Sequence, residues 1–218
     1  MRLRSLVCAL AALAFPTSPA IAQVGAPREL TSAARYPSAP RLQDMNADGV
    51  LDAVVNADGR LLWYPGSSAG AFGLKQGLDT DPYIVSRFEF ADLDQDGNDD
   101  LLATDYLSAT VYWQRGLSGG DFAAPAALLS SVPNMLEASA ADLDLDGDLD
   151  VVAQSLIAGV FVQENLGGGA WGTAQRVTPA GDRPDRFGVG DVTGDGLPDI
   201  LYGSFTFKRV SYVPARGG

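Results

Sequence analysis

Aspartate residues recur at a fixed spacing in four nine-residue segments of this chain. The segments, here called loops 1 to 4, cover residues 44–52, 92–100, 142–150 and 191–199. Each follows the pattern Asp-x-[Asp/Asn/Thr]-x-Asp-Gly-x-x-Asp. Alternate carboxylates can converge on one ion when the chain curls around it, and Ca²⁺ takes six to eight oxygen ligands. Glycine at position 6 permits the sharp turn. The pattern therefore predicts up to four Ca²⁺ ions, one in each loop.

The predicted ligands are the side chains at positions 1, 3, 5 and 9 and the main-chain carbonyl at position 7. They are Asp44, Asn46, Asp48, Val50 and Asp52; Asp92, Asp94, Asp96, Asn98 and Asp100; Asp142, Asp144, Asp146, Asp148 and Asp150; and Asp191, Thr193, Asp195, Leu197 and Asp199. Loops 1 and 4 have one carboxylate fewer at these positions, so we expect them to bind more weakly. An EF-hand would need Glu at position 12, where none occurs. A single loop of this kind could be an ordinary acidic turn, but four in phase favour calcium.

The loops sit in a repeat of about 49 residues, since their first aspartates lie 48, 50 and 49 residues apart. Each loop is followed by a short apolar run, a second strand-like run and a Gly-x-aromatic element, as at residues 151–153, 160–162 and 169–171. Four short strands in such a unit are typical of a β-propeller blade. The predicted fold class is all-β, a β-propeller of four-stranded antiparallel blades, with a β-sandwich as the alternative. The aromatic residues Trp63, Phe72, Trp113, Phe122 and Trp171 are predicted to pack between blades.

The two ends of the repeat array match each other. The last repeat stops before its Gly-x-aromatic element, whereas Val24 and Leu30 stand where Phe72 and Leu78 stand before the next loop. We therefore predict four blades, with the N-terminal strand closing the last blade, in one domain over residues 23–218. This arrangement would be monomeric. Half of a larger ring, either paired with a second copy or truncated, is the alternative.

The first 22 residues have the features of a secretory signal peptide. Arg2 and Arg4 precede an apolar run, and Ala20-Ile21-Ala22 is a small-x-small cleavage site. No other stretch is long enough to span a membrane. We expect a secreted protein, periplasmic or extracellular, cleaved near Ala22. Cys8 is the only cysteine, so the secreted chain would have no disulfide.

Composition narrows the function classes. The 218 residues carry a formal net charge of −12 and no histidine. Histidine-based catalytic triads and histidine-ligated zinc are thereby excluded. The acidic balance also argues against nucleic acid as a partner.

The loops, the apolar strand that follows them and the Gly-x-aromatic element together resemble the FG-GAP/VCBS repeat family, which includes the propeller of the integrin α-subunit. The resemblance covers nearly all of the chain after the signal. It implies a calcium-binding β-propeller with ligands at positions 1, 3, 5 and 9 of each loop. The chain has four such repeats, whereas the integrin domain has seven.

We expect a non-catalytic binding module of the adhesion type, with a glycan or protein ligand. The expected surface lies opposite the calcium loops, where aromatic and acidic residues gather, namely Tyr83, Tyr106, Phe205, Phe207, Asp58, Asp79, Asp81, Asp105, Asp182, Asp185 and Arg183. Two alternatives remain: a carbohydrate-active lyase or hydrolase that uses paired carboxylates, and a purely structural assembly module.

Overall fold

The computed structural model describes residues 29–30, 37–74, 76–78, 80 and 83–215. The chain divides into two compact units, Met1–Ser32 and Ala33–Gly218, and every strand lies in the second. The described residues form strands and turns and contain no helix. The predicted all-β class is therefore confirmed.

Strands that follow one another along the chain pair to form four antiparallel sheets. The first contains β1 (Pro37–Gln43), β2 (Asp52–Ala57), β3 (Arg60–Tyr64) and β4 (Gln76–Gly77); the second contains β5 (Arg87–Ala91), β6 (Asp100–Asp105), β7 (Thr110–Gln114) and β8 (Ala126–Leu129); the third contains β9 (Met135–Ala141), β10 (Asp150–Ser155), β11 (Gly159–Gln163) and β12 (Gln175–Arg176); and the fourth contains β13 (Arg186–Gly190), β14 (Asp199–Ser204) and β15 (Arg209–Val213). Up to residue 215 the fourth sheet has no outer strand, as the repeat pattern predicted.

Loops 1 to 4 connect the first two strands of each sheet. Glycine at position 6 has a positive φ in every loop, between 83° and 98°. Position 4 is also left-handed, at Ala47, Gln95, Leu145 and Gly194. Two left-handed residues in quick succession turn the chain tightly, which brings the side chains at positions 1, 3 and 5 toward a common point.

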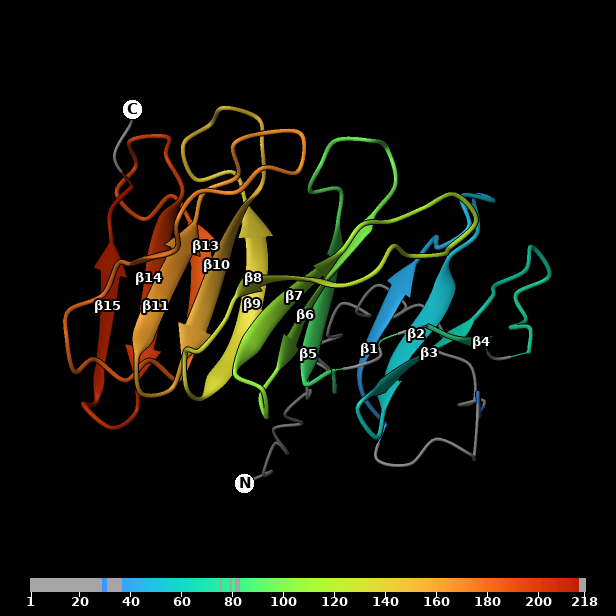
Figure 1. Cartoon of the computed structure of the whole chain (residues 1–218), viewed down its shortest axis with the longest axis horizontal. Coiled ribbons are helices and arrows are strands. Elements are labelled where there is room, and N and C mark those ends of the chain that lie inside the picture. Colours follow the sequence, from blue (N-terminus) through green and yellow to red (C-terminus); the bar gives the residue numbers. More distant parts are fainter. Residues whose placement is uncertain (1–28, 31–36, 75, 79, 81–82, 216–218) are drawn as a thin grey trace, which may run out of the picture. The chain divides into compact units, whose positions relative to one another are not determined.

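Each sheet has two faces, because alternate side chains of a strand point to opposite sides. The face turned toward the next sheet in the chain is here called the forward face, and the opposite face the rear face. Three buried clusters join consecutive sheets. Forward-face residues Val54, Leu102 and Val152 lie in the first, second and third cluster, where they meet residues such as Leu101, Val151 and Ile200 of the following sheet. Figure 1 shows the four sheets following one another in chain order within this unit.

Of the five aromatic residues predicted to pack between blades, four lie between consecutive sheets. Trp63 and Phe122 belong to the cluster between the first and second sheets, and Trp113 and Trp171 to the next one. The Trp113 and Trp171 rings meet edge to face, with centroids 5.7 Å apart. Phe72 instead is 44% exposed and lies in none of the clusters of the described residues.

Closure of the array into a ring is not seen. Among the described residues, no buried cluster joins the fourth sheet to the first. The predicted closing strand falls largely on residues 23–28, which lie outside the described residues. Leu30, which is described, belongs to no strand. The β-propeller architecture is therefore supported sheet by sheet, while the number of blades stays a prediction.

Candidate metal centre

The aspartate at position 9 holds each loop against its own sheet. Asp52, Asp100, Asp150 and Asp199 are all at most 3% exposed. One carboxylate oxygen of each accepts a hydrogen bond from the backbone N–H of position 2, at 2.9 to 3.1 Å. The other oxygen accepts from a backbone N–H just after the third strand, at 2.6 to 2.9 Å. This residue therefore fixes the loop even without a metal.

Carboxylates at positions 1, 3 and 5 organise the loop from inside. In loop 2, Asp92 Oδ2 accepts from Gly97 N at 3.0 Å, and Asp96 Oδ1 accepts from Asn98 N at 2.9 Å. The same two contacts recur in the other loops, for example Gly147 N to Asp142 Oδ2 at 3.2 Å. The backbone N–H groups of each loop thus hold these side chains in place.

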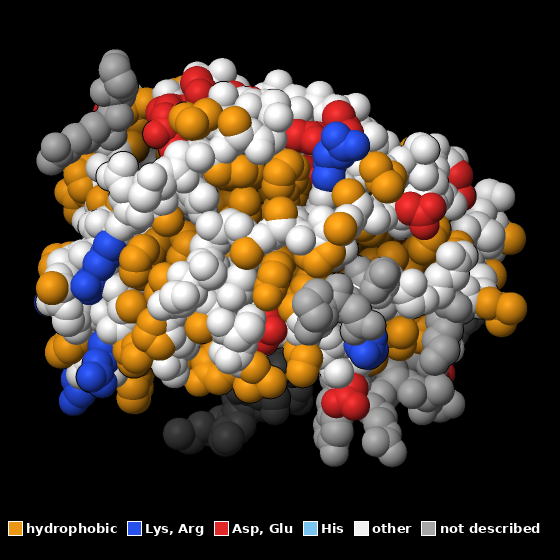
Figure 2. Space-filling view, in the orientation of Figure 1, with side chains coloured by type: hydrophobic (Ala, Val, Ile, Leu, Met, Phe, Trp, Pro, Cys, Tyr) orange, Lys and Arg blue, Asp and Glu red, His pale blue; other side chains and the backbone are white. Residues whose placement is uncertain are grey.

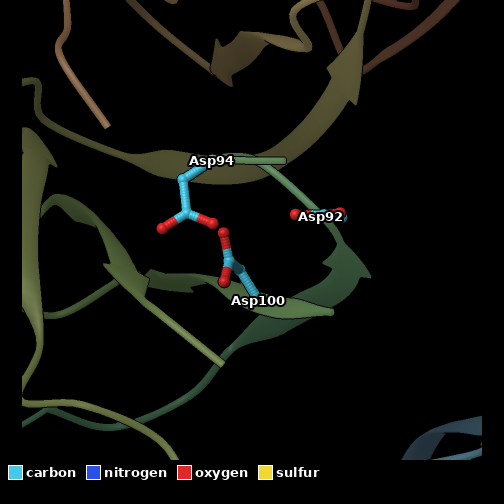
Figure 3. Close-up of side chains that lie close together, drawn as sticks. All are labelled: Asp92, Asp94 and Asp100. Atoms are coloured by element: carbon cyan, nitrogen blue, oxygen red, sulfur yellow. The ribbon is translucent and has the colours of Figure 1, made fainter. Parts of the chain in front are cut away.

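Loops 2 and 3 bring three carboxylates together. One oxygen from each of Asp92, Asp94 and Asp100 lies within 4.8 Å of the others, and the same is true of Asp142, Asp144 and Asp146. Figure 3 shows Asp94 and Asp100 directed toward each other, with Asp92 beside them. Both groups contain the aspartates at positions 1 and 3. The third member is the aspartate at position 9 in loop 2 and the one at position 5 in loop 3.

One carboxylate oxygen of Asp142 favours a cation in loop 3. This Oδ1 is buried and has no hydrogen-bond partner among the described residues. A buried carboxylate oxygen without a partner is costly. A cation bound among Asp142, Asp144 and Asp146 would satisfy it, so the residues present fit a hard divalent ion.

The raised pKa values of two loop aspartates also favour a bound cation. Burial, and then the carboxylate of Asp96, raises the pKa of Asp94 above its ordinary value. The pKa of Asp150 is raised mainly by burial, with smaller contributions from the carboxylates of Asp144 and Asp146. The ionised forms of these groups are therefore disfavoured without a counter-charge, and a bound cation would reverse this effect.

Loops 1 and 4 place their predicted ligands in the same local structure, but with fewer acids. Within the described chain, neither loop holds three carboxylates close enough to form such a group. Asn46 occupies position 3 of loop 1, where its amide donates to Asp48 Oδ2 at 3.0 Å, and Thr193 occupies position 3 of loop 4. The expected difference in strength between the loops is consistent with this arrangement.

Contacts between neighbouring loops are a feature that the sequence did not reveal. Gln95 Nε2 donates to Gly147 O and to Asp148 Oδ1, both at 2.7 Å, so loop 2 is tied to loop 3. Asp148 was predicted to contribute its main-chain carbonyl, and that prediction is not affected by this side-chain contact. Gln43 similarly donates to Asp99 and links the first sheet to loop 2. Figure 2 shows acidic side chains gathered along the upper edge of this view.

The predicted ligand surface opposite the loops is only partly exposed. Tyr83 was expected there but is 4% exposed, because its ring stacks on Tyr112 with centroids 4.4 Å apart. Asp105 and Asp182 are buried as well. Asp105 accepts from two backbone N–H groups of the following turn, and Asp182 accepts from Tyr202 and Arg209. Asp79 and Asp81 lie outside the described residues.

A model of the FG-GAP-like repeat matches the chain at residues 44–103 and 92–153, which together span half of its length. The chain therefore belongs to the FG-GAP-like repeat family. No curated protein matches it. Among the described residues there is also no helix long and apolar enough to cross a membrane.

Two solved structures share the fold. One is an Agrocybe aegerita lectin studied for its specific recognition of non-reducing terminal N-acetylglucosamine: 22% identity, TM-score 0.55, covering 80% of this chain and 51% of the lectin chain. The other is the pore of the Photorhabdus luminescens Tc holotoxin: 18% identity, TM-score 0.50, covering 79% of this chain and 9% of that one. The chain thus spans about half the length of the lectin chain.

Proposed function

We propose that this protein is a secreted, calcium-binding module of the β-propeller type that binds a glycan and catalyses no reaction. The observation that carries the calcium assignment is the buried, unpartnered Oδ1 of Asp142 beside Asp144 and Asp146. Family membership supports it, because the matched repeats contain these loops. Secretion rests on the signal-like residues 1–22 alone.

Calcium would offset the repulsion between the carboxylates. Two such charges 4 Å apart repel by about 1 kcal/mol in water, and by more beside low-dielectric protein. Oxygen-only ligands in a flexible loop suit Ca²⁺ better than Mg²⁺, which keeps more of its water. Loops 2 and 3 would hold the tighter ions, and loops 1 and 4 the weaker ones.

Native mass spectrometry of the secreted chain with added calcium tests this assignment. We expect up to four ions, with two retained at the lowest calcium concentrations. Asp144→Asn should remove one of the tight ions and lower affinity at that loop at least about tenfold, because one of the three converging carboxylates loses its charge. Asp121→Asn, at an exposed turn aspartate, is the matched control. An unchanged ion count in Asp144→Asn, or no calcium uptake at all, would rule out the site.

A binding role is supported by aromatic residues that remain open opposite the loops. Phe205 is 87% exposed, Phe207 47% and Tyr106 42%. Aromatic faces of this kind can stack against sugar rings, and the likeness to a lectin favours a glycan over a protein. Two carboxylates on which the enzyme alternative could draw make contacts within the protein. Asp182 is held by Arg209, and Asp185 accepts from the backbone of Phe205.

A glycan array probed with the calcium-loaded protein tests the ligand class. We expect retention of a restricted set of glycans, with at least about tenfold weaker binding by Phe205→Ala because a stacking face is lost. Leu74→Ala removes a side chain that is 91% exposed in another turn and serves as the control. Retention of no glycan, or equal loss in both variants, would contradict a glycan ligand.

A further inference from the structure

A pocket of about 350 Å³ lies between the forward face of the third sheet and the rear face of the fourth. Most of its lining is apolar, for example Val162 of the third sheet and Ile200 of the fourth. The described residues that line it include no lysine or arginine but three acids, Asp144, Asp150 and Glu164. An apolar pocket of this size with a few polar groups is typical of a small-molecule site.

The repeat places a tryptophan at the corresponding position between the second and third sheets. By strand register, Val162 of β11 is the counterpart of Trp113 of β7, which lies in the cluster between those two sheets. The Trp113 indole donates through Nε1 to Asp100 Oδ2 at 2.8 Å. Val162 is smaller and has no donor for Asp150, the counterpart of Asp100. The third sheet therefore keeps the acceptor but lacks the ring and its N–H.

A positive charge is also replaced at this position. Arg115, two residues after Trp113, has its Nε 3.8 Å from Asp94 Oδ2. The counterparts of this ion pair are Glu164 and Asp144, both of which line the pocket. An attractive pair in the second sheet thus becomes two like charges in the third, which favours a cationic ligand.

A hydrogen bond that crosses between sheets is missing here as well. Asn165 Nδ2 of the third sheet donates to Leu93 O of the second at 2.7 Å. The counterpart of Asn165 on the fourth sheet is Ala215, since the backbone N–H of each bonds the aspartate at position 9 of its own sheet. Leu93 is fully buried, whereas its counterpart Leu143 is only partly buried. The pocket is therefore the space that larger, donor-bearing side chains fill one sheet earlier.

We propose that this pocket binds a small aromatic molecule that carries a ring N–H and a protonated amine. The ring would lie beside Val162 and donate to Asp150, as the Trp113 indole does to its own aspartate. The amine would supply the missing positive charge beside Glu164. Asp144 is also a proposed calcium ligand, so in the calcium-loaded protein the attraction to the amine would come chiefly from Glu164. None of the exposed aromatic residues proposed to bind a glycan lines this pocket, so the two sites are separate.

Isothermal titration calorimetry of the calcium-loaded protein with tryptamine, an indole that carries a protonated ethylamine, tests the proposal. We expect saturable binding at a single site. Indole, which lacks the charge, and ethylamine, which lacks the ring, should each bind at least about fivefold more weakly. Equal binding of indole or ethylamine, or no binding of tryptamine at millimolar concentration, overturns the proposal.

Two variants locate the tryptamine site. Val162→Trp should weaken binding at least about tenfold, because its own indole would fill the pocket. Glu164→Gln should weaken it about fivefold through loss of charge, and its exposed side chain makes folding insensitive to the change. Asp121→Asn, at an exposed aspartate outside the pocket lining, should leave the affinity unchanged.

Circular dichroism shows whether each variant folds, and the Glu164→Gln result decides if Val162→Trp does not. Unchanged affinity in either variant that folds, or an equal loss in Asp121→Asn, overturns the proposal.

Discussion

At the residue scale, the aspartates of one loop have two different tasks. The carboxylate at position 9 is buried and accepts backbone hydrogen bonds that connect the loop to its sheet. In loop 2, Asp100 also accepts from the Trp113 indole at 2.8 Å. The carboxylate at position 3 of loop 2, Asp94, accepts a single long backbone hydrogen bond, from Asp96 N at 3.3 Å, and lies 3.8 Å from Arg115 Nε. Burial together with the carboxylate of Asp96 raises its pKa. Proposed metal binding and loop structure would therefore depend on partly separate residues.

Substitution in calcium-free buffer separates these tasks. Asp100→Ala should lower the free energy of unfolding by about 1–3 kcal/mol, because buried N–H groups of Leu93 and Gly116 lose their acceptor. Asp94→Asn should leave it unchanged or raise it slightly, since the lost charge is disfavoured without metal. Chemical denaturation of both variants, monitored by tryptophan fluorescence, measures the difference. Equal destabilisation would contradict the division of tasks.

At the element scale, the Gly-x-aromatic turns allow neighbouring sheets to approach. A Cβ at Gly120 would lie 2.9 Å from Trp63 Cη2 and 3.0 Å from Met45 O. Gly169 is placed in the same way against the Trp113 ring. The turn of one sheet thus rests directly on the tryptophan of the preceding sheet. The sequence indicated the turns and the tryptophans, but not that they touch.

Gly120→Ala should destabilise the protein more than Gly119→Ala. Both glycines have positive φ, 87° and 84°, so the backbone strain of alanine is similar in the two variants. Only Gly120 has a neighbour within 4 Å of the added methyl group. We expect an additional loss of about 1–3 kcal/mol in Gly120→Ala from overpacking. Thermal unfolding of the two variants side by side would detect it, and identical melting temperatures would refute the contact.

At the scale of the whole molecule, the net charge of −12 is concentrated in the loops. They hold 16 of the 23 aspartates and no basic residue. On the proposed function, bound calcium would add to the hydrogen bonds by which position 9 already holds each loop to its sheet. This local density of carboxylates favours a cation in the loops and says little about the choice of a partner.

The sequence alone determined the repeat, the four loops and the strand order inside each sheet. These features are local, because turn residues and alternating apolar positions act over a few neighbours. It also placed Trp63 and Trp113 between sheets, since their period matches the repeat. It misplaced Tyr83, whose burial depends on Tyr112 about thirty residues away.

Only the tertiary structure decided which aspartates support the backbone and which positions of the repeat are exposed in a given sheet. Such properties depend on distances between residues far apart in the chain, as between Gln95 and Asp148 or between Gly120 and Trp63. A repeat pattern specifies what each unit presents to its neighbours. Whether a given face meets a neighbour depends on how the units stack in three dimensions, because the same residues are buried in one sheet and exposed in another.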